Sequence, residues 1–263
     1  MPSPTLPIKR VLLTNDDGID APGLAILEQV ARKLAAEIWI VAPEHDRSGT
    51  SHSISLHAPL RVSEQGKRRY ATSGTPGDCV VLAVRNLMAD SPPELILSGI
   101  NRGANLGIET VFSGTVGAAM TGMLLRIPSI ALSQMFIDRT EVLWDTARQR
   151  APDIIRHFLA HGWHRKCCLN INFPAVPAHE SGPLIISRQG AGFLRGIDVI
   201  SRVDPRGFTY HWLQFQREPE MEGDEAEGSL LAKGFVTATP LQFERTNEMA
   251  FAELRKTMST LLQ

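Results

Sequence analysis

Apolar residues along the chain recur with two different periods, and the alternation between these periods predicts the first elements. Val11 to Leu13 is a short apolar run that ends in a polar loop, and residues 22–34 follow with apolar side chains at helical spacing. Residues 38–41 then form a second apolar run. A strand, a helix and a second strand in this order form a βαβ unit, which predicts a parallel sheet with helices on its faces.

The same alternation continues along the chain up to residue 171. Helices are expected at residues 78–88, 115–125 and 146–161. Strands are expected at residues 95–97, 129–132 and 168–171. This rhythm is typical of a doubly wound α/β fold. We therefore expect one large α/β domain that spans residues 1–263.

The pattern changes after about Gly190. Strand-like segments at residues 210–215 and 235–240 lie on either side of an acidic stretch, residues 218–227, which is too polar to pack in a core. We interpret the region at about 191–234 as an extended hairpin arm. An amphipathic helix is predicted for residues 243–262. Arms and terminal helices of this kind often contact a second subunit, which predicts a homodimer.

Composition and charge exclude several classes of protein. The chain has 263 residues, with 27 basic and 28 acidic side chains and no long basic run, so a duplex nucleic-acid binder is not expected. No apolar stretch is long enough to cross a bilayer, and residues 1–9 lack the apolar core of a signal peptide. A soluble cytoplasmic protein without a membrane partner is predicted. Without Cys-x-x-Cys spacing, the three cysteines are expected to be reduced packing residues: Cys79, Cys167 and Cys168.

Two adjacent carboxylates, Asp16 and Asp17, follow the first predicted strand and point to a metal site. Neighbouring negative charges repel one another at the end of a buried strand, and a divalent cation converts this repulsion into attraction. A hard cation such as Mg²⁺ or Mn²⁺ suits carboxylate oxygens. The structural alternative is that one carboxylate caps the helix that begins near Pro22 while the other is solvated.

Four polar loops that contain glycine should meet at one edge of the sheet, because ligands of open α/β sheets bind where the strands end. The loops are residues 15–18, 44–53, 98–105 and 112–115. Each loop alone also has an explanation as turn glycines and helix-capping serines. Together they favour a binding site.

Two of these loops would complete the metal site, and a third would bind phosphate. Ser48 and Asn101 would add neutral oxygen ligands to the two carboxylates and leave positions open for water and substrate. Residues 113–115 precede a predicted helix, where free backbone N–H groups and the helix dipole favour an anion. A cation on one side and a helix N-terminus on the other would stabilise a transferring phosphoryl group.

Motifs of competing functions are absent from the sequence. There is no Gly-x-Gly-x-x-Gly after the first strand, no Walker Gly-Lys-Ser/Thr and no Gly-x-Ser-x-Gly elbow. The first loop also lacks the Asp-x-Asp spacing of aspartyl-phosphate phosphatases. His45, His52 and His57 lie in or just after the second loop, and one of them could donate a proton to a leaving alcohol. A surface histidine without a role is the simpler explanation of each.

Several motifs occur in a fixed order along the chain. They are Asn15-Asp16-Asp17-Gly18, Val41-Ala42-Pro43 with Arg47-Ser48-Gly49, Gly74-Thr75-Pro76, residues 98–107, Ser113-Gly114-Thr115-Val116, Leu169-Asn170-Ile171-Asn172 and residues 234–241. This series covers almost the whole chain and closely resembles the SurE family, the stationary-phase survival proteins. Two positions depart from the family pattern. Phe112 stands where Tyr or His often precedes Ser-Gly-Thr, and Thr121 stands where an acidic residue is common.

The resemblance implies a metal-dependent phosphatase that hydrolyses nucleoside 5'-monophosphates, with 3'-nucleotides and short polyphosphate as further substrates of some members. It implies one divalent metal ion per subunit, Mg²⁺ or Mn²⁺, held by Asp16, Asp17, Ser48 and Asn101. It also implies a cytoplasmic protein with a Rossmann-like core, a three-layer sandwich around a mainly parallel sheet. The subunits of the family form a homodimer or homotetramer through exchanged C-terminal arms.

The resulting hypothesis is phosphomonoester hydrolysis in which Asp16 and Asp17 are catalytic, and either could accept the proton of the attacking water. Two other classes of function stay open. One is a non-catalytic α/β module that binds a nucleotide or metabolite, and the other is a structural oligomer whose acidic loop binds a stabilising ion. The residues expected to bind the substrate and its phosphate are Asn15, Gly49, Asn105, Ser113, Gly114 and Thr115.

Overall fold

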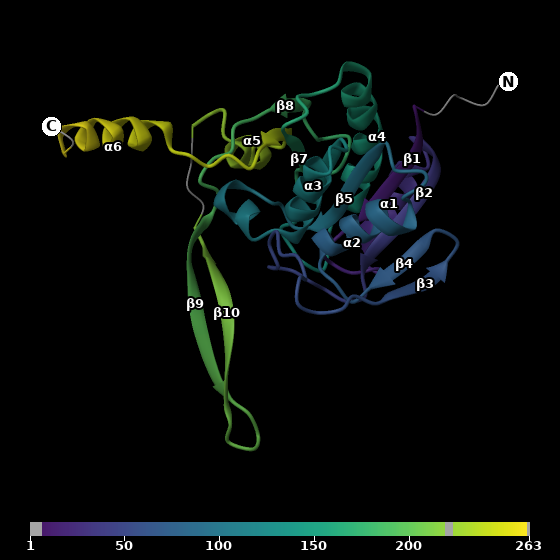
Figure 1. Ribbon diagram of the computed structural model, residues 1–263, viewed down its shortest axis with the longest axis horizontal. Coiled ribbons are helices and arrows are strands. Elements are labelled where there is room, and N and C mark those ends of the chain that lie inside the picture. Colours follow the sequence, from purple (N-terminus) through teal and green to yellow (C-terminus); the bar gives the residue numbers. More distant parts are fainter. Residues whose placement is uncertain (1–6, 219–222, 262–263) are drawn as a thin grey trace.

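A nine-stranded, mainly parallel sheet forms the centre of the protein (Figure 1). The computed structural model describes residues 7–218 and 223–261. Within these residues, the neighbouring pairs from β4 to β7 are parallel, whereas β3 joins β4 and β11 joins β7 in antiparallel pairs. Across the sheet lie, in order, β3 (Val62–Gly66), β4 (Arg69–Thr72), β2 (Ala35–Pro43), β1 (Ile8–Thr14), β5 (Leu95–Arg102), β6 (Ser129–Gln134), β7 (Cys168–Phe173), β11 (Val236–Leu241) and β8 (Leu184–Ile186).

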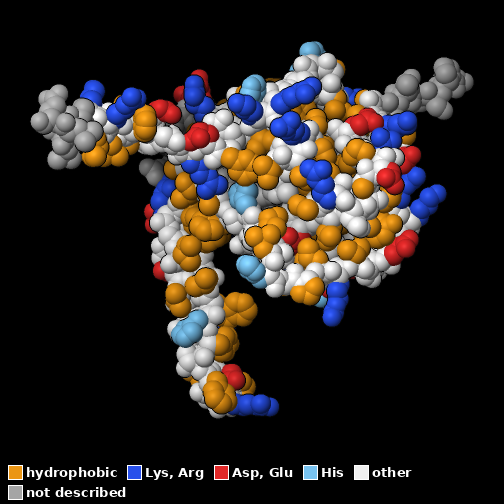
Figure 2. Space-filling model, viewed as in Figure 1, with side chains coloured by type: hydrophobic (Ala, Val, Ile, Leu, Met, Phe, Trp, Pro, Cys, Tyr) orange, Lys and Arg blue, Asp and Glu red, His pale blue; other side chains and the backbone are white. Residues whose placement is uncertain are grey.

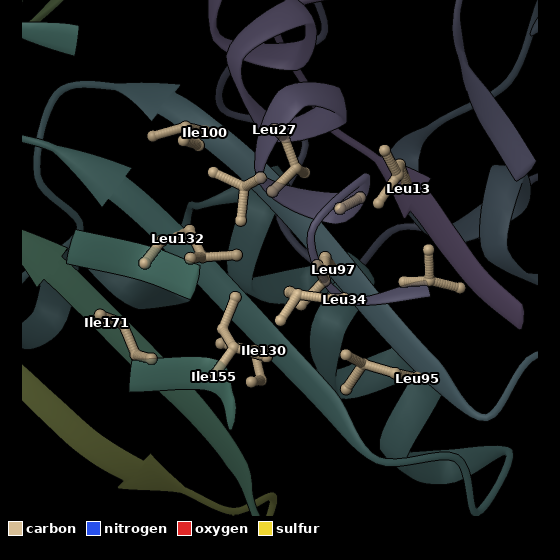
Figure 3. Packing of buried hydrophobic residues seen from close by; sticks show 14 of the residues in the cluster. Leu13, Leu27, Leu34, Leu95, Leu97, Ile100, Ile130, Leu132, Ile155 and Ile171 are labelled. Carbon is tan, nitrogen blue, oxygen red and sulfur yellow. The ribbon is translucent and has the colours of Figure 1, made fainter. Parts of the chain in front are cut away.

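Helices cover both faces of this sheet. The helices α1 (Pro22–Ala31) and α4 (Trp144–His161) lie on one face, and α2 (Pro76–Leu82), the π-helix η1 (Ala83–Leu87) and α3 (Gly114–Leu124) lie on the other. Alternate strand residues supply the two cores, as the period of two in a strand requires. Leu13 belongs to the cluster of α1 and α4, shown in Figure 3, while its neighbour Leu12 belongs to the cluster of α2 and η1. The predicted three-layer α/β fold is confirmed.

Most of the predicted helices and strands occur in the structure, with ends that differ by a few residues. The predicted strand at 95–97 extends to Arg102, and the predicted helix at 78–88 divides into α2 and η1. The hairpin of β3 and β4 was not predicted, because all residues of β3 are exposed and the sequence there lacks an apolar face.

The C-terminal part differs from the sequence interpretation in its pairing. The predicted strand at 210–215 lies in β10 (Thr209–Arg217), and its partner is the antiparallel strand β9 (Leu194–Val203). These two strands form the arm that extends from the body in Figure 1. Residues 235–240, which the sequence pattern places beside the arm, instead form most of β11 in the central sheet.

The acidic stretch at 218–227 contains a carboxylate that is buried, contrary to the prediction. Residues 219–222 lie outside the described part of the chain, but Glu227, the first residue of α5 (Glu227–Ala232), is fully buried. Its carboxylate accepts hydrogen bonds from the backbone N–H of Gly107 at 2.7 Å and from the hydroxyl of Thr239 at 2.6 Å. The prediction that this stretch cannot pack in a core is therefore wrong for Glu227.

The terminal helix α6 (Glu248–Leu261) also projects from the body (Figure 1). It begins later than the predicted residue 243, and Met249, Leu254 and Met258 on it are exposed. Figure 2 shows further hydrophobic side chains along the arm. Both projecting elements therefore carry apolar side chains that a single chain leaves uncovered.

Two predictions from composition can be compared with the structure. None of the helices within the described residues has the length and apolar character needed to span a bilayer. The three cysteines are free thiols, and Cys79 and Cys168 are buried while Cys167 is partly buried. Burial raises the pKa of Cys79 and of Cys168 to about 12, so both are inert packing residues.

Candidate active site

Three hydrogen bonds tie the predicted loops together at the carboxyl edge of the sheet. The backbone N–H of Arg47, in the loop after β2, donates to the Asp16 carbonyl at 2.7 Å. The backbone N–H of Arg102, at the end of β5, donates to Oδ2 of Asp17 at 3.1 Å. Ser51 donates from its backbone to the Phe112 carbonyl at 3.1 Å. The four loops therefore converge as the sequence predicts.

A cavity of about 390 Å³ lies between these loops. Its wall contains both carboxylates and residues from each of the other three loops. Seven of the predicted site residues line it: Asp16, Asp17, Ser48, Gly49, Asn101, Asn105 and Ser113.

Asp16 lies at the cavity floor and is buried, with 4% of its surface exposed. The Thr115 hydroxyl donates a hydrogen bond to its Oδ1. Gly114 lets helix α3 approach this side chain, because a Cβ at Gly114 would lie 2.8 Å from the Asp16 Cβ. Burial, and to a smaller extent the charge of Asp17, raises the pKa of Asp16 to about 7.

Asp17 is half-buried beside it. Burial raises the pKa of Asp17, the Asp46 charge adds to this effect, and the backbone N–H of Arg102 opposes it. Both pKa values move in the direction expected when burial disfavours the charged form of a carboxylate. A divalent cation would stabilise the charged forms.

The other predicted ligands fit a hard cation. Asn101 donates from Nδ2 to the Gly103 carbonyl at 2.8 Å, so its amide oxygen is the atom that would bind a cation. Ser48 is exposed and lines the cavity. Among the described residues no group of three or more His, Cys, Asp or Glu side chains could hold a metal ion. The predicted donor set consists of two carboxylates with neutral oxygens. Such a set suits Mg²⁺ or Mn²⁺ better than Zn²⁺.

Asn105 is held in place by a buried amide network. Its backbone N–H donates to Oδ1 of Asn172 at 2.9 Å, and its carbonyl accepts from Nδ2 of Asn170 at 2.8 Å. Its side-chain Nδ2 donates to the Ser133 hydroxyl at 2.7 Å. The network explains why polar residues occupy the buried ends of β6 and β7.

Three predicted site residues do not line the cavity. Asn15 donates from Nδ2 to the Gly18 carbonyl at 2.8 Å, which closes the tight turn where Gly18 has φ of +103°. Gly114 and Thr115 lie behind Asp16. Ser113 does line the cavity, and its hydroxyl caps α3 by accepting from the Val116 N–H at 3.1 Å.

The histidines of the second loop are not brought to this cavity. His45 and His57 do not line it, and His52 lines a separate cavity with Met120 and Arg245. Burial and the charge of Arg245 lower the pKa of His52. The geometry therefore gives no support to a histidine proton donor.

Several residues of the cavity were not predicted from the sequence. Arg102 lies within the third predicted loop, and Arg139 lies in the segment after β6. Phe112, which opens the fourth predicted loop, also lines the cavity. A further group comes from the 3₁₀ turn η2 (Gly107–Val111) and from the root of the arm: Glu109, Phe193, Phe215 and Arg217. Only the folded chain brings the arm to this cavity, so no local sequence signal marks its residues.

Comparisons with known proteins agree with this architecture. A family model described as "Survival protein SurE" matches residues 11–195. The chain is 58% identical to "5'-nucleotidase SurE 1" of Burkholderia lata over 95% of this chain and 96% of the relative. It is 46% identical to "5'-nucleotidase SurE" of Rhodopseudomonas palustris over 95% of this chain and all of the relative. The crystal structure of the Sure protein from Aquifex aeolicus superposes with a TM-score of 0.81 at 31% identity, over 95% of this chain and 99% of that one.

Proposed function

Because this chain belongs to the SurE family and is a 5'-nucleotidase like its named relatives, we propose that it hydrolyses nucleoside 5'-monophosphates with the help of one divalent cation. The observation that carries the proposal is the pair of buried and half-buried carboxylates, Asp16 and Asp17, at the floor of a cavity lined by neutral oxygen donors. Ser48 and Asn101 would complete the ligand set.

The bound cation would neutralise phosphate charge and lower the pKa of a coordinated water, which supplies a nucleophile near neutral pH. Thr115 holds the Asp16 carboxylate, and Arg102 holds that of Asp17. We propose that Asp17 accepts the proton of the attacking water, since this carboxylate is more exposed than that of Asp16. The same proton would pass to the 5' oxygen of the leaving nucleoside as its bond to phosphorus breaks.

The phosphate oxygens that do not contact the cation would bind positively charged side chains or free backbone N–H donors. Arg102 and Arg139 line the cavity, and their charges partly oppose the rise that burial causes in the pKa of Asp17. The N-terminus of α3 begins at Gly114 behind the carboxylates, and its dipole favours anions there. Asn105 and Gly49 complete the proposed phosphate site, while Asn15, Gly114 and Thr115 shape it without lining the cavity.

The oligomer is part of the proposal. The exposed apolar side chains of the arm and of α6 support a homodimer or homotetramer formed through these elements. The cytoplasmic location, the use of 3'-nucleotides and polyphosphate, and the choice between Mg²⁺ and Mn²⁺ rest on the family resemblance alone.

A phosphate-release assay tests the proposal. Purified protein with adenosine 5'-monophosphate and Mn²⁺ or Mg²⁺ should release inorganic phosphate, and EDTA should stop the release. A metabolite-binding module would bind the nucleotide without releasing phosphate. A structural oligomer with an ion in its acidic loop would show a metal-dependent melting temperature and no turnover.

A further inference from the structure

The cavity of the proposed active site has a second, aromatic side. Phe112 follows η2, Phe193 precedes β9, and Phe215 lies on β10, and all three line the cavity together with Asp16 and Asp17. The ring centroids of Phe112 and Phe215 are 5.6 Å apart, with 47° between the ring planes. These three half-buried rings form what we call the aromatic wall.

An ion pair fixes the aromatic wall to the body of the protein. Arg217 donates from Nε to Oε1 of Glu109 at 3.0 Å and from Nη2 to Oε2 at 2.9 Å. The Glu109 side chain is only 10% exposed, and the Arg217 guanidinium lies 5.3 Å from the centre of the Phe215 ring. Because the two charges satisfy one another, this side of the cavity presents flat apolar rings.

The size of the cavity indicates a ligand larger than phosphate. Its volume of about 390 Å³ lies within the range of small-molecule sites, ~300–1,000 Å³. Phosphate and a cation would occupy the end that contains the carboxylates, so the aromatic end is left for the rest of the substrate. Aromatic side chains bind nucleobases by stacking, and they tolerate any base because every base has a flat π-face.

We propose that the aromatic wall binds the base of the nucleotide and makes the enzyme select nucleoside monophosphates over phosphomonoesters that lack a base. This proposal rests on the proposed function, because the phosphate must occupy the carboxylate end. If the aromatic wall only anchors the arm, removing one of its rings should change kcat/KM for all phosphomonoesters equally. If the wall binds the base, removing a ring should change kcat/KM only for phosphomonoesters that carry a base.

The test compares adenosine 5'-monophosphate with ribose 5-phosphate, which shares the phosphorylated ribose but carries a hydroxyl at C1 in place of the base. Phe112→Leu and Phe215→Leu keep apolar bulk at each position and remove the ring. Each should lower the ratio of kcat/KM for the nucleotide to kcat/KM for the sugar phosphate about tenfold, since stacking of a base on one ring contributes roughly that factor. Phe208→Leu, on the same arm but 70% exposed and outside the cavity, is the matched control and should leave the ratio unchanged.

Two further measurements make the outcome decisive. Phe112→Tyr keeps the ring and should retain the wild-type ratio. An unchanged ratio in both leucine variants, with circular dichroism and oligomeric state as in the wild type, would overturn the aromatic wall as a base site. If the wild type hydrolysed neither substrate, the proposed function would fail. Calorimetric titration of the two compounds would then still decide whether the wall binds the base.

Discussion

The charge of Asp16 is needed for the proposed cation binding but destabilises the folded protein when no cation is bound. Asp16 is almost completely buried, and its pKa is raised from 3.8 to about 7, so the protein without a cation must bury an unfavourable charge above neutral pH. Asp16→Asn should therefore stabilise the metal-free protein while abolishing phosphate release. The gain should approach about 4 kcal/mol above pH 7, since each pKa unit corresponds to about 1.4 kcal/mol.

Because the pKa of Asp16 is raised, the stability difference between Asp16→Asn and wild type should depend on pH. The penalty is absent below the unfolded pKa of 3.8, where both states bind the proton, grows as the pH rises, and is complete above about 7. Urea unfolding in EDTA should show a larger difference between Asp16→Asn and wild type at pH 8 than at pH 5. A difference that is constant over this range would contradict the raised pKa.

Gly114 tests how closely helix α3 must approach the carboxylate. In Gly114→Ala, the new Cβ would lie 2.8 Å from the Asp16 Cβ, so the side chain or the helix must shift. Cation affinity, measured by calorimetry, should fall about tenfold, because ligand geometry must be held closely. Gly228→Ala, also in the first turn of a helix but with its nearest contact at 3.6 Å, is the control and should bind the cation normally. Equal cation affinities in Gly114→Ala and Gly228→Ala would show that the close approach of helix α3 does not hold Asp16 for cation binding.

At the scale of elements, the pair of Glu109 and Arg217 is one of the contacts that link the arm to the body. Glu109→Gln removes one charge of a bidentate pair in which Glu109 is 10% exposed and Arg217 is 54% exposed, and should weaken the docking of the arm by about 1 kcal/mol. Hydrogen exchange of backbone amides at residues 215–217 should then accelerate about fivefold. Glu225→Gln breaks an ion pair with Arg188 whose side chains are 78% and 82% exposed, and should leave exchange there unchanged. Exchange at 215–217 as slow as in the wild type would show that other contacts hold the arm.

The sequence predicts the elements and the carboxylate end of the site because both depend on local signals. Apolar periodicity marks the strands. Asp16 and Ser48 follow strands, Asn101 lies near the end of β5, and these strand ends must meet at one edge of the sheet. Phe215 and Arg217 could not be predicted in this way. Their place in the cavity depends on the contacts that the arm makes with η2 and Phe112. No sequence pattern within β10 indicates these contacts.

For the molecule as a whole, the uncovered apolar surface predicts assembly. Leu213 on the arm is 75% exposed and Leu254 on α6 is 66% exposed, so a single chain leaves both projecting elements without partners for these side chains. The double variant Leu213→Asp with Leu254→Asp should have a smaller molar mass by light scattering than the wild type. Leu56→Asp, 79% exposed on a loop of the body, is the control. A wild type that is already monomeric would contradict the assembly.

The placement of a cation between Asp16 and Asp17 is the central claim and can be measured directly. Crystals soaked in Mn²⁺ should show one anomalous peak within coordination distance of both carboxylates, with Ser48 and Asn101 around it, and the peak should be absent from Asp16→Asn crystals. A wild-type cavity without a peak, or a peak bound elsewhere while these side chains turn toward solvent, would contradict the account.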